Sequence, residues 1–153
     1  MIQFQFYKNH IRGTAQYQKI TLARGFLCNV KPSLLTVLTN NSGCTGRPVY
    51  LSTKSLKHIH DRHVYDKGNF SEFIVILQNL TRIIKFPDEV RMDARSKRGD
   101  FMFVKNVAAQ PYFVSIQISP VGEMDIVSSS ATGESYLKNF TLLWSWGSAN
   151  SPS

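Results

Sequence analysis

Three histidines lie within six residues of this 153-residue chain, at His58, His60 and His63. The spacing of His60 and His63 could serve a metal ion on a helix, but no HExxH motif, carboxylate cluster or CxxC pair completes such a site. An imidazole titrates near neutral pH, so these side chains are also candidates for general acid and base catalysis. We predict no metal and no cofactor, and leave open that His63 is a hydrogen-bonded core residue and His58 merely exposed.

Cations and hydroxyl groups elsewhere in the chain extend this chemistry. Metal-free cleavage of RNA needs a base for the 2′-hydroxyl, an acid for the leaving 5′-oxygen, and cations or hydroxyl donors around the phosphorus. The candidate catalytic residues are His58, Arg62, His63, Ser128, Ser129, Thr132 and Tyr136. The candidate nucleic-acid-binding residues are Lys54, Lys57, Arg91, Arg95, Lys97 and Arg98. Each also has an ordinary structural interpretation, because a basic turn is often only solvated surface.

The charge is unevenly distributed along the chain. There are 18 Lys and Arg against 10 Asp and Glu, and residues 1–60 contain eight basic residues and no acidic one. This asymmetry predicts a polyanionic partner, and the Tyr, Phe and His residues among the cations favour RNA, whose bases stack on aromatic rings. A soluble basic protein with a solvated surface is the alternative.

Composition and length limit the class of protein. Hydrophobic residues make up 42% of the chain, enough for one compact domain with a core. The longest wholly apolar run is Phe73 to Leu77, far short of the roughly 20 residues that cross a bilayer. Cys28 and Cys44 are the only cysteines, which argues against a disulfide framework. We therefore expect a cytoplasmic protein with no membrane partner.

The elements that must position these residues follow from hydrophobic periodicity and turn signals. The helix predicted from Ser52–Thr53 to about Tyr65, ended by Gly68, places His58 and Arg62 together and turns Leu56, Ile59 and His63 to the core. The other predictions are a strand at 2–6, a helix starting near 32, a loop at 40–48, a helix at 71–81, a strand or turn at 83–92, strands at 101–105, 113–118 and 124–127, and a helix at 133–142.

Together these elements predict an α+β fold in which a basic N-terminal segment and helices pack against a C-terminal antiparallel sheet. We divide the chain into an N-terminal extension of the same compact unit (1–48), a core (49–143) and a flexible tail (144–153).

The order of elements and their residues resemble a known superfamily. The run Leu56–His63 (LKHIHDRH), a strand meander, and a last strand running into Val127–Ser130 and then Tyr136–Lys138 are similar to the phage-associated branch of the barnase, EndoU, colicin and RelE-type (BECR) nucleases. The resemblance covers roughly residues 49–140. It implies a BECR-like nuclease core and a metal-independent endoribonuclease of the phage or bacterial toxin type, which cleaves RNA, with tRNA as one candidate, through the 2′-hydroxyl.

The resemblance also implies roles for individual residues. His58 or His63 would be the acid or base, Arg62 and the group from Arg91 to Arg98 would bind phosphate, Ser128 or Ser129 would donate a hydrogen bond to it, and Tyr136 would support or stack. An acidic immunity protein or antitoxin is the implied protein partner. Two alternatives remain open: a nucleic-acid-binding module without catalysis, and a protein-interaction subunit of a phage defence or toxin system.

Overall fold

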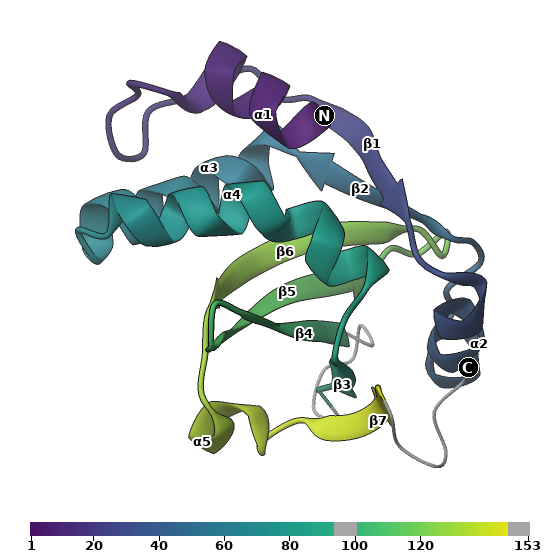
Figure 1. Cartoon of the computed structure of the whole chain (residues 1–153). Helices are drawn as coiled ribbons and strands as arrows, with labels where there is room; N and C mark the ends of the chain where they lie inside the picture. The colour runs from purple at the N-terminus through teal and green to yellow at the C-terminus, as the bar shows by residue number, and fades with distance from the viewer. Residues whose placement is uncertain (94–100, 147–153) are drawn as a thin grey trace.

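A seven-stranded sheet forms the centre of the computed structural model, which describes residues 1–93 and 101–146. Helices pack against this sheet (Figure 1), so the predicted α+β class is confirmed. The strands are β1 (Arg24–Asn29), β2 (Pro48–Ser52), β3 (Glu89–Met92), β4 (Phe101–Val107), β5 (Gln110–Ile118), β6 (Met124–Ala131) and β7 (Thr141–Ser145). The helices are α1 (Ile2–Phe6), α2 (Pro32–Asn41), α3 (Thr53–Asp61), α4 (Phe70–Lys85) and α5 (Glu134–Leu137), with π-helical turns η1 (Tyr7–Ile11) and η2 (Arg62–Asp66).

The sheet is mixed, with the strand order β1-β2-β6-β5-β4-β3-β7. Strands β3 to β6 form the predicted antiparallel meander. The predicted C-terminal antiparallel sheet is found in β3 to β7, and two strands that were not predicted in it extend it, because β2 pairs parallel to β6 and brings β1 with it. The run Arg24–Asn29 was not predicted as a strand because it has no alternation of polar and apolar residues.

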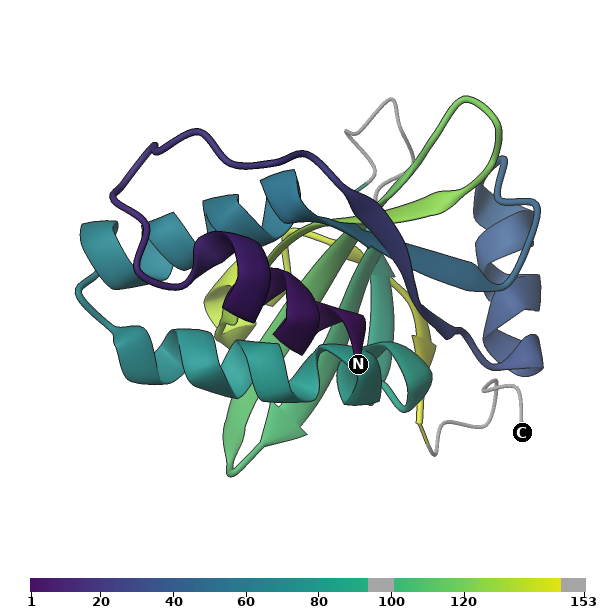
Figure 2. The ribbon, with the colours of Figure 1, turned by 90° about the horizontal axis from the view of Figure 1, so that it is seen from above.

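Helices α1, α3 and α4 cover one face of the sheet, as Figure 2 shows from above. Phe73, Phe101 and Phe103 are fully buried in the core between these layers. On the opposite face a smaller apolar cluster joins Met102 and Val104 of β4 to Leu137 of α5. Successive strand residues point to opposite faces, so β4 serves both clusters. None of the helices in the described ranges is long and apolar enough to cross a membrane.

Helices α3 and α4 each begin at a side-chain cap. The Ser52 hydroxyl accepts a hydrogen bond from the Ser55 N–H at 3.0 Å and begins α3, as predicted. Gly68, at φ +60°, follows η2 and reverses the chain. Asn69, rather than the predicted Ser71, begins α4 by accepting from the Glu72 N–H at 3.0 Å. The short connection sets α3 and α4 side by side.

Several predicted elements are wrong. Residues 2–6 form α1, because Gln3 and Phe6, three apart, are buried together, and this packing overrides the alternation of Ile2 to Phe6. Residues 83–85 continue α4, because Ile83 and Ile84 extend its buried face. Within the last predicted helix, 133–142, only α5 is helical, and β7 already begins at Thr141.

The predicted flexible tail begins too early. Trp144 and Ser145 belong to β7, where they pair with Val90 and Glu89 of β3. Residues 147–153 lie outside the described residues. In the N-terminal 48 residues, β1 belongs to the same sheet as the predicted core.

Candidate functional site

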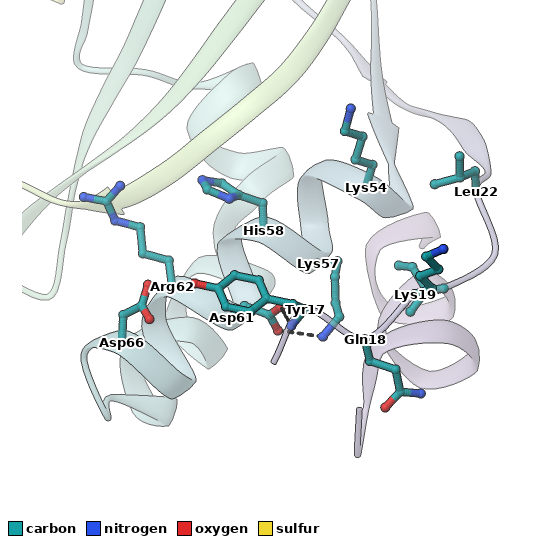
Figure 3. Close-up of a pocket in the computed structure, with 11 residues that line it drawn as sticks. Tyr17, Gln18, Lys19, Leu22, Lys54, Lys57, His58, Asp61, Arg62 and Asp66 are labelled. Atoms are coloured by element: carbon teal, nitrogen blue, oxygen red, sulfur yellow. Dashed lines mark hydrogen bonds and ion pairs between the residues drawn. The ribbon is translucent and has the colours of Figure 1, made fainter. Parts of the chain in front are cut away.

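Three polar side chains project from one side of α3 and η2. Lys54, His58 and Arg62 are four residues apart and exposed, as the helical spacing predicts. Figure 3 shows them directed away from Lys57 and Asp61. They line a pocket of about 660 Å³ whose other wall is the segment from Tyr17 to Leu22. We call it the His58 pocket.

A second pocket, of about 350 Å³, lies where β6 ends. It is lined by five of the seven predicted catalytic residues: Arg62, Ser128, Ser129, Thr132 and Tyr136. Lys67 and Phe113 also line it, and we call it the Ser128 pocket. Arg62 lines both pockets, and we call its position the junction of the two.

The hydroxyl groups of the Ser128 pocket are not equally available. Ser129 is buried, and its hydroxyl donates to the Phe113 carbonyl at 2.6 Å, so it holds β6 to β5. The Thr132 Oγ1 is buried without a hydrogen-bond partner. Ser128 and Ser130 are half-buried, and Tyr136 is 48% exposed. Ser128, Ser130 and Tyr136 are thus the ones that a ligand could contact directly.

His63 lies in neither pocket. It is fully buried, and its Nδ1–H donates to the Ile59 carbonyl at 2.8 Å. Its Nε2 has no hydrogen-bond partner and lies 3.6 Å from Glu72 Oε1. The pKa of His63 is lowered, chiefly because the ring is buried. The hydrogen bond to the Ile59 carbonyl and the charge of Glu72 act to raise it but do not outweigh burial. The geometry does not support the prediction that His63 is catalytic, because it cannot reach a substrate; the alternative of a core histidine fits.

Glu72 is a residue of the site that sequence reasoning missed. Its Oε1 accepts hydrogen bonds from the Ala131 N–H at 2.9 Å and from the Ser130 hydroxyl at 3.4 Å. Ser130 Oγ in turn accepts from Lys67 Nζ at 3.1 Å. Glu72 therefore ties the first turn of α4 to the end of β6 and fixes the floor of the Ser128 pocket. In the sequence it has only the ordinary signature of an acidic residue near a helix N-terminus.

Lys57, predicted to bind phosphate, is instead part of a buried ion pair. Its Nζ lies 2.7 Å from Asp61 Oδ1 and donates to the Ala15 carbonyl at 2.7 Å. Burial tends to raise the pKa of Asp61, but hydrogen bonds from Lys57, the Tyr17 N–H and His60 outweigh it, so the pKa lies below its ordinary value. The ammonium group of Lys57 is thus already paired, which helical spacing cannot show, because it does not reveal which side of α3 the N-terminal segment covers.

Arg91, the one member of the predicted basic cluster that the structure describes, lines neither pocket. Arg91 donates from Nε to Glu89 at 2.6 Å and from Nη1 to the Leu137 and Phe140 carbonyls at 3.3 and 3.1 Å. It anchors the chain after α5 to β3, so these intramolecular partners already occupy its guanidinium. Arg95, Lys97 and Arg98 lie outside the described residues.

His60, the remaining histidine of α3, is also a core residue. Its Nδ1 lies 2.9 Å from Asp61 Oδ1, and its ring packs edge to face against Phe73 and Tyr65. In the described ranges no three His, Cys, Asp or Glu side chains gather as a metal site would require. His58 is thus the one histidine of the LKHIHDRH run whose ring reaches a pocket.

Comparison of the chain with protein-family models, with curated proteins and with solved structures finds no match. The two pockets and the side chains that line them are therefore the basis for a functional proposal.

Proposed function

We propose that the chain is a metal-independent endoribonuclease that acts at the junction of the two pockets. The observation that supports this best is the position of Arg62, which lines both the pocket of His58 and the pocket of the β6 hydroxyls. A guanidinium binds phosphate through a fork of N–H groups, so a phosphodiester at this junction would have an imidazole on one side and hydroxyl donors on the other.

The proposed reaction uses the RNA's own 2′-hydroxyl as nucleophile. His58 takes the proton of that hydroxyl while its oxygen attacks phosphorus, and the bond from phosphorus to the 5′-oxygen breaks. Lys67 and Tyr136 are the side chains in the Ser128 pocket that could give the leaving oxygen its proton. The products are a 2′,3′-cyclic phosphate and a 5′-hydroxyl. Arg62, with Ser128, would stabilise the charge that develops on the phosphoryl oxygens.

Exposed cations on both sides of the junction suit an RNA backbone. Lys54 lies on the His58 side and Lys67 on the Ser128 side, and both are exposed. The chain's net charge of +8 would draw a polyanion toward the molecule from a distance.

One observation favours a second candidate function, which is RNA binding without cleavage. The burial of His60 and His63 leaves a single accessible imidazole near the junction, whereas transesterification needs both a base and an acid. In this alternative, Arg62 and the lysines hold phosphates and no bond is broken.

Incubation of total RNA with the purified protein in excess EDTA tests the proposal. We expect fragments that are lost with His58→Gln or Arg62→Gln and persist with the matched controls His10→Gln and Arg82→Gln, whose sites line neither pocket. Intact RNA that is nevertheless shifted on a gel would support binding without cleavage. RNA neither cut nor bound would contradict both functions and point to the protein-interaction role.

A further inference from the structure

A tyrosine in an unusual backbone conformation lines the His58 pocket. Tyr17 has φ +62°, a left-handed conformation that residues other than glycine rarely adopt. The residue is 81% exposed, so burial of its ring does not offset the cost of this conformation. Figure 3 shows the ring in front of α3, with its hydroxyl end directed toward Arg62, and both residues line the pocket.

Side chains of α3 and η2 hold the segment that carries this ring. The Tyr17 N–H donates to Asp61 Oδ2 at 3.0 Å, and the buried Lys57 donates to the Ala15 carbonyl at 2.7 Å. Two further hydrogen bonds run from Gln16 Nε2 to Asp66 Oδ1 at 2.6 Å and from the Tyr65 hydroxyl to the Thr14 carbonyl. The backbone that carries the ring is therefore held beside the pocket before any ligand arrives, which lowers the entropic cost of binding.

The walls of the His58 pocket combine an aromatic face with cations. Ile20 and Leu22 add apolar surface beside Tyr17, and Leu22 is 75% exposed. Lys54 and Arg62 supply positive charge on the opposite wall, where Asp61 and Asp66 also lie but are already bonded to Lys57 and Gln16. A volume of about 660 Å³ lies within the range of pockets that hold small ligands. An exposed aromatic ring next to cations suits a nucleobase and its phosphate, because every base has a face that stacks.

Building on the proposed function, we propose that Tyr17 is the stacking platform of a nucleotide subsite for single-stranded RNA. One base lies on Tyr17 in the His58 pocket, the next nucleotide lies in the Ser128 pocket, and the phosphate between them lies at Arg62. A base in a duplex is stacked on its neighbours and paired, so it cannot enter the His58 pocket. The two pockets would thus select single-stranded segments, loops or ends of an RNA.

Binding to an RNA that cannot be cleaved tests this subsite separately from catalysis. The probe is a short, mixed-sequence, single-stranded RNA with a 2′-O-methyl group on every nucleotide, measured by fluorescence anisotropy. We expect Tyr17→Ala to weaken binding about tenfold, since stacking contributes roughly 1–3 kcal/mol per base. Tyr17→Phe should bind like the unchanged protein. Trp146→Ala, which removes a ring that is 72% exposed and lines neither pocket, should have no effect.

A salt series separates stacking from charge. Tyr17→Ala should lower the affinity without altering the slope of log K against log salt, because the tyrosine neutralises no phosphate. Photocrosslinking of the unchanged protein to the same probe carrying 5-bromouridine gives a second measurement that needs no variant. We expect the cross-linked peptide to contain Tyr17.

Each outcome supports or overturns the subsite. Equal affinity of Tyr17→Ala and the unchanged protein would overturn it while leaving the endoribonuclease proposal standing. Tyr17-dependent binding by a protein that cuts no RNA would support the subsite and contradict the proposed catalysis. Equally tight binding to the duplex form of the probe, cross-links only at other residues, or no binding by the unchanged protein would overturn the subsite.

Discussion

At the scale of single residues, burial divides side chains that the sequence cannot tell apart. His58, His60 and His63 are close in sequence, but only the first is exposed, and the other two are 4% and 0% exposed. The same division separates Lys54, which is exposed, from Lys57, which is buried and paired with Asp61. Types and spacing predicted that His58 and Arg62 project from one side of a helix, and the structure brings Arg62 and the β6 hydroxyls to one pocket. They could not predict Tyr17 and Glu72, whose partners are 44 and 59 residues away in the chain.

The Lys57–Asp61 pair gives a prediction about stability. The two side chains are each only 8% exposed, so Lys57→Met leaves a buried carboxylate without its cation. We expect the free energy of unfolding to fall by about 3 kcal/mol in urea denaturation. The double variant Lys57→Met/Asp61→Asn should lose less than the sum of the two single losses, because it leaves no unpaired charge. Additive losses would show that the two groups do not interact.

His63 gives a prediction about pH. Its pKa is lowered in the folded protein, chiefly by burial, so the unfolded chain takes up the proton first as the pH falls. His63 therefore contributes stability that is fully present above the ordinary histidine pKa of about 6.5 and is lost as the pH falls below it. We expect the free energy of unfolding to drop between pH 7 and a mildly acidic pH, about 5.5. His63→Asn, whose amide can still donate to Ile59, should reduce that drop, and an unchanged drop would contradict this assignment.

At the scale of elements, the sequence predicted what local signals govern. The Ser52 cap, the end of α3 and η2 before Gly68, and the β-branched and aromatic strands of the meander all follow from short-range preferences. The sequence-based prediction failed where tertiary packing decides the secondary structure. The alternating sequence of α1 would suit a strand but forms a helix. Residues 141–145 form strand β7 because β3 offers them an edge. The Ser128 pocket depends on such packing, because Glu72 joins the start of α4 to the end of β6.

Replacement of Gly68 tests the turn between η2 and α4. Its φ of +60° is unfavourable for any residue with a Cβ, so Gly68→Ala should cost about 1 kcal/mol of stability. Gly43→Ala is the matched control, because Gly43 has no positive φ and nothing lies within 4 Å of an added Cβ. Urea denaturation of both variants checks this. A loss in Gly43→Ala as large as that in Gly68→Ala would contradict the role of the left-handed conformation.

At the scale of the whole molecule, the mixed sheet brings the basic N-terminal part and the hydroxyl-bearing β6 into one unit. Strand β2 runs from that basic part directly into α3 and pairs with β6, and α3 packs on β6. Side chains on the two sides of the junction therefore come from segments about half the chain apart, and Arg62 lines both pockets.

The charge of the molecule predicts salt-dependent RNA binding. Removing one phosphate-binding cation should reduce the slope of log K against log salt by about 0.7 for a single strand. We expect Lys54→Gln and Arg62→Gln to show this reduction, and Arg82→Gln, an exposed change on α4, to leave the slope unaltered. Equal reductions in all three variants would indicate binding by diffuse charge rather than at the junction.

The most direct test of the proposed reaction compares two RNAs that differ by one oxygen atom. One is a single-stranded RNA cut by the protein in EDTA, and the other carries a 2′-deoxy residue at the nucleotide that precedes the cut. We predict that the first gives a 2′,3′-cyclic phosphate, identified by mass spectrometry, and that the second is not cut at that position. Cleavage of the deoxy substrate at the same bond, or no cleavage of any RNA, would contradict transesterification at the Arg62 junction.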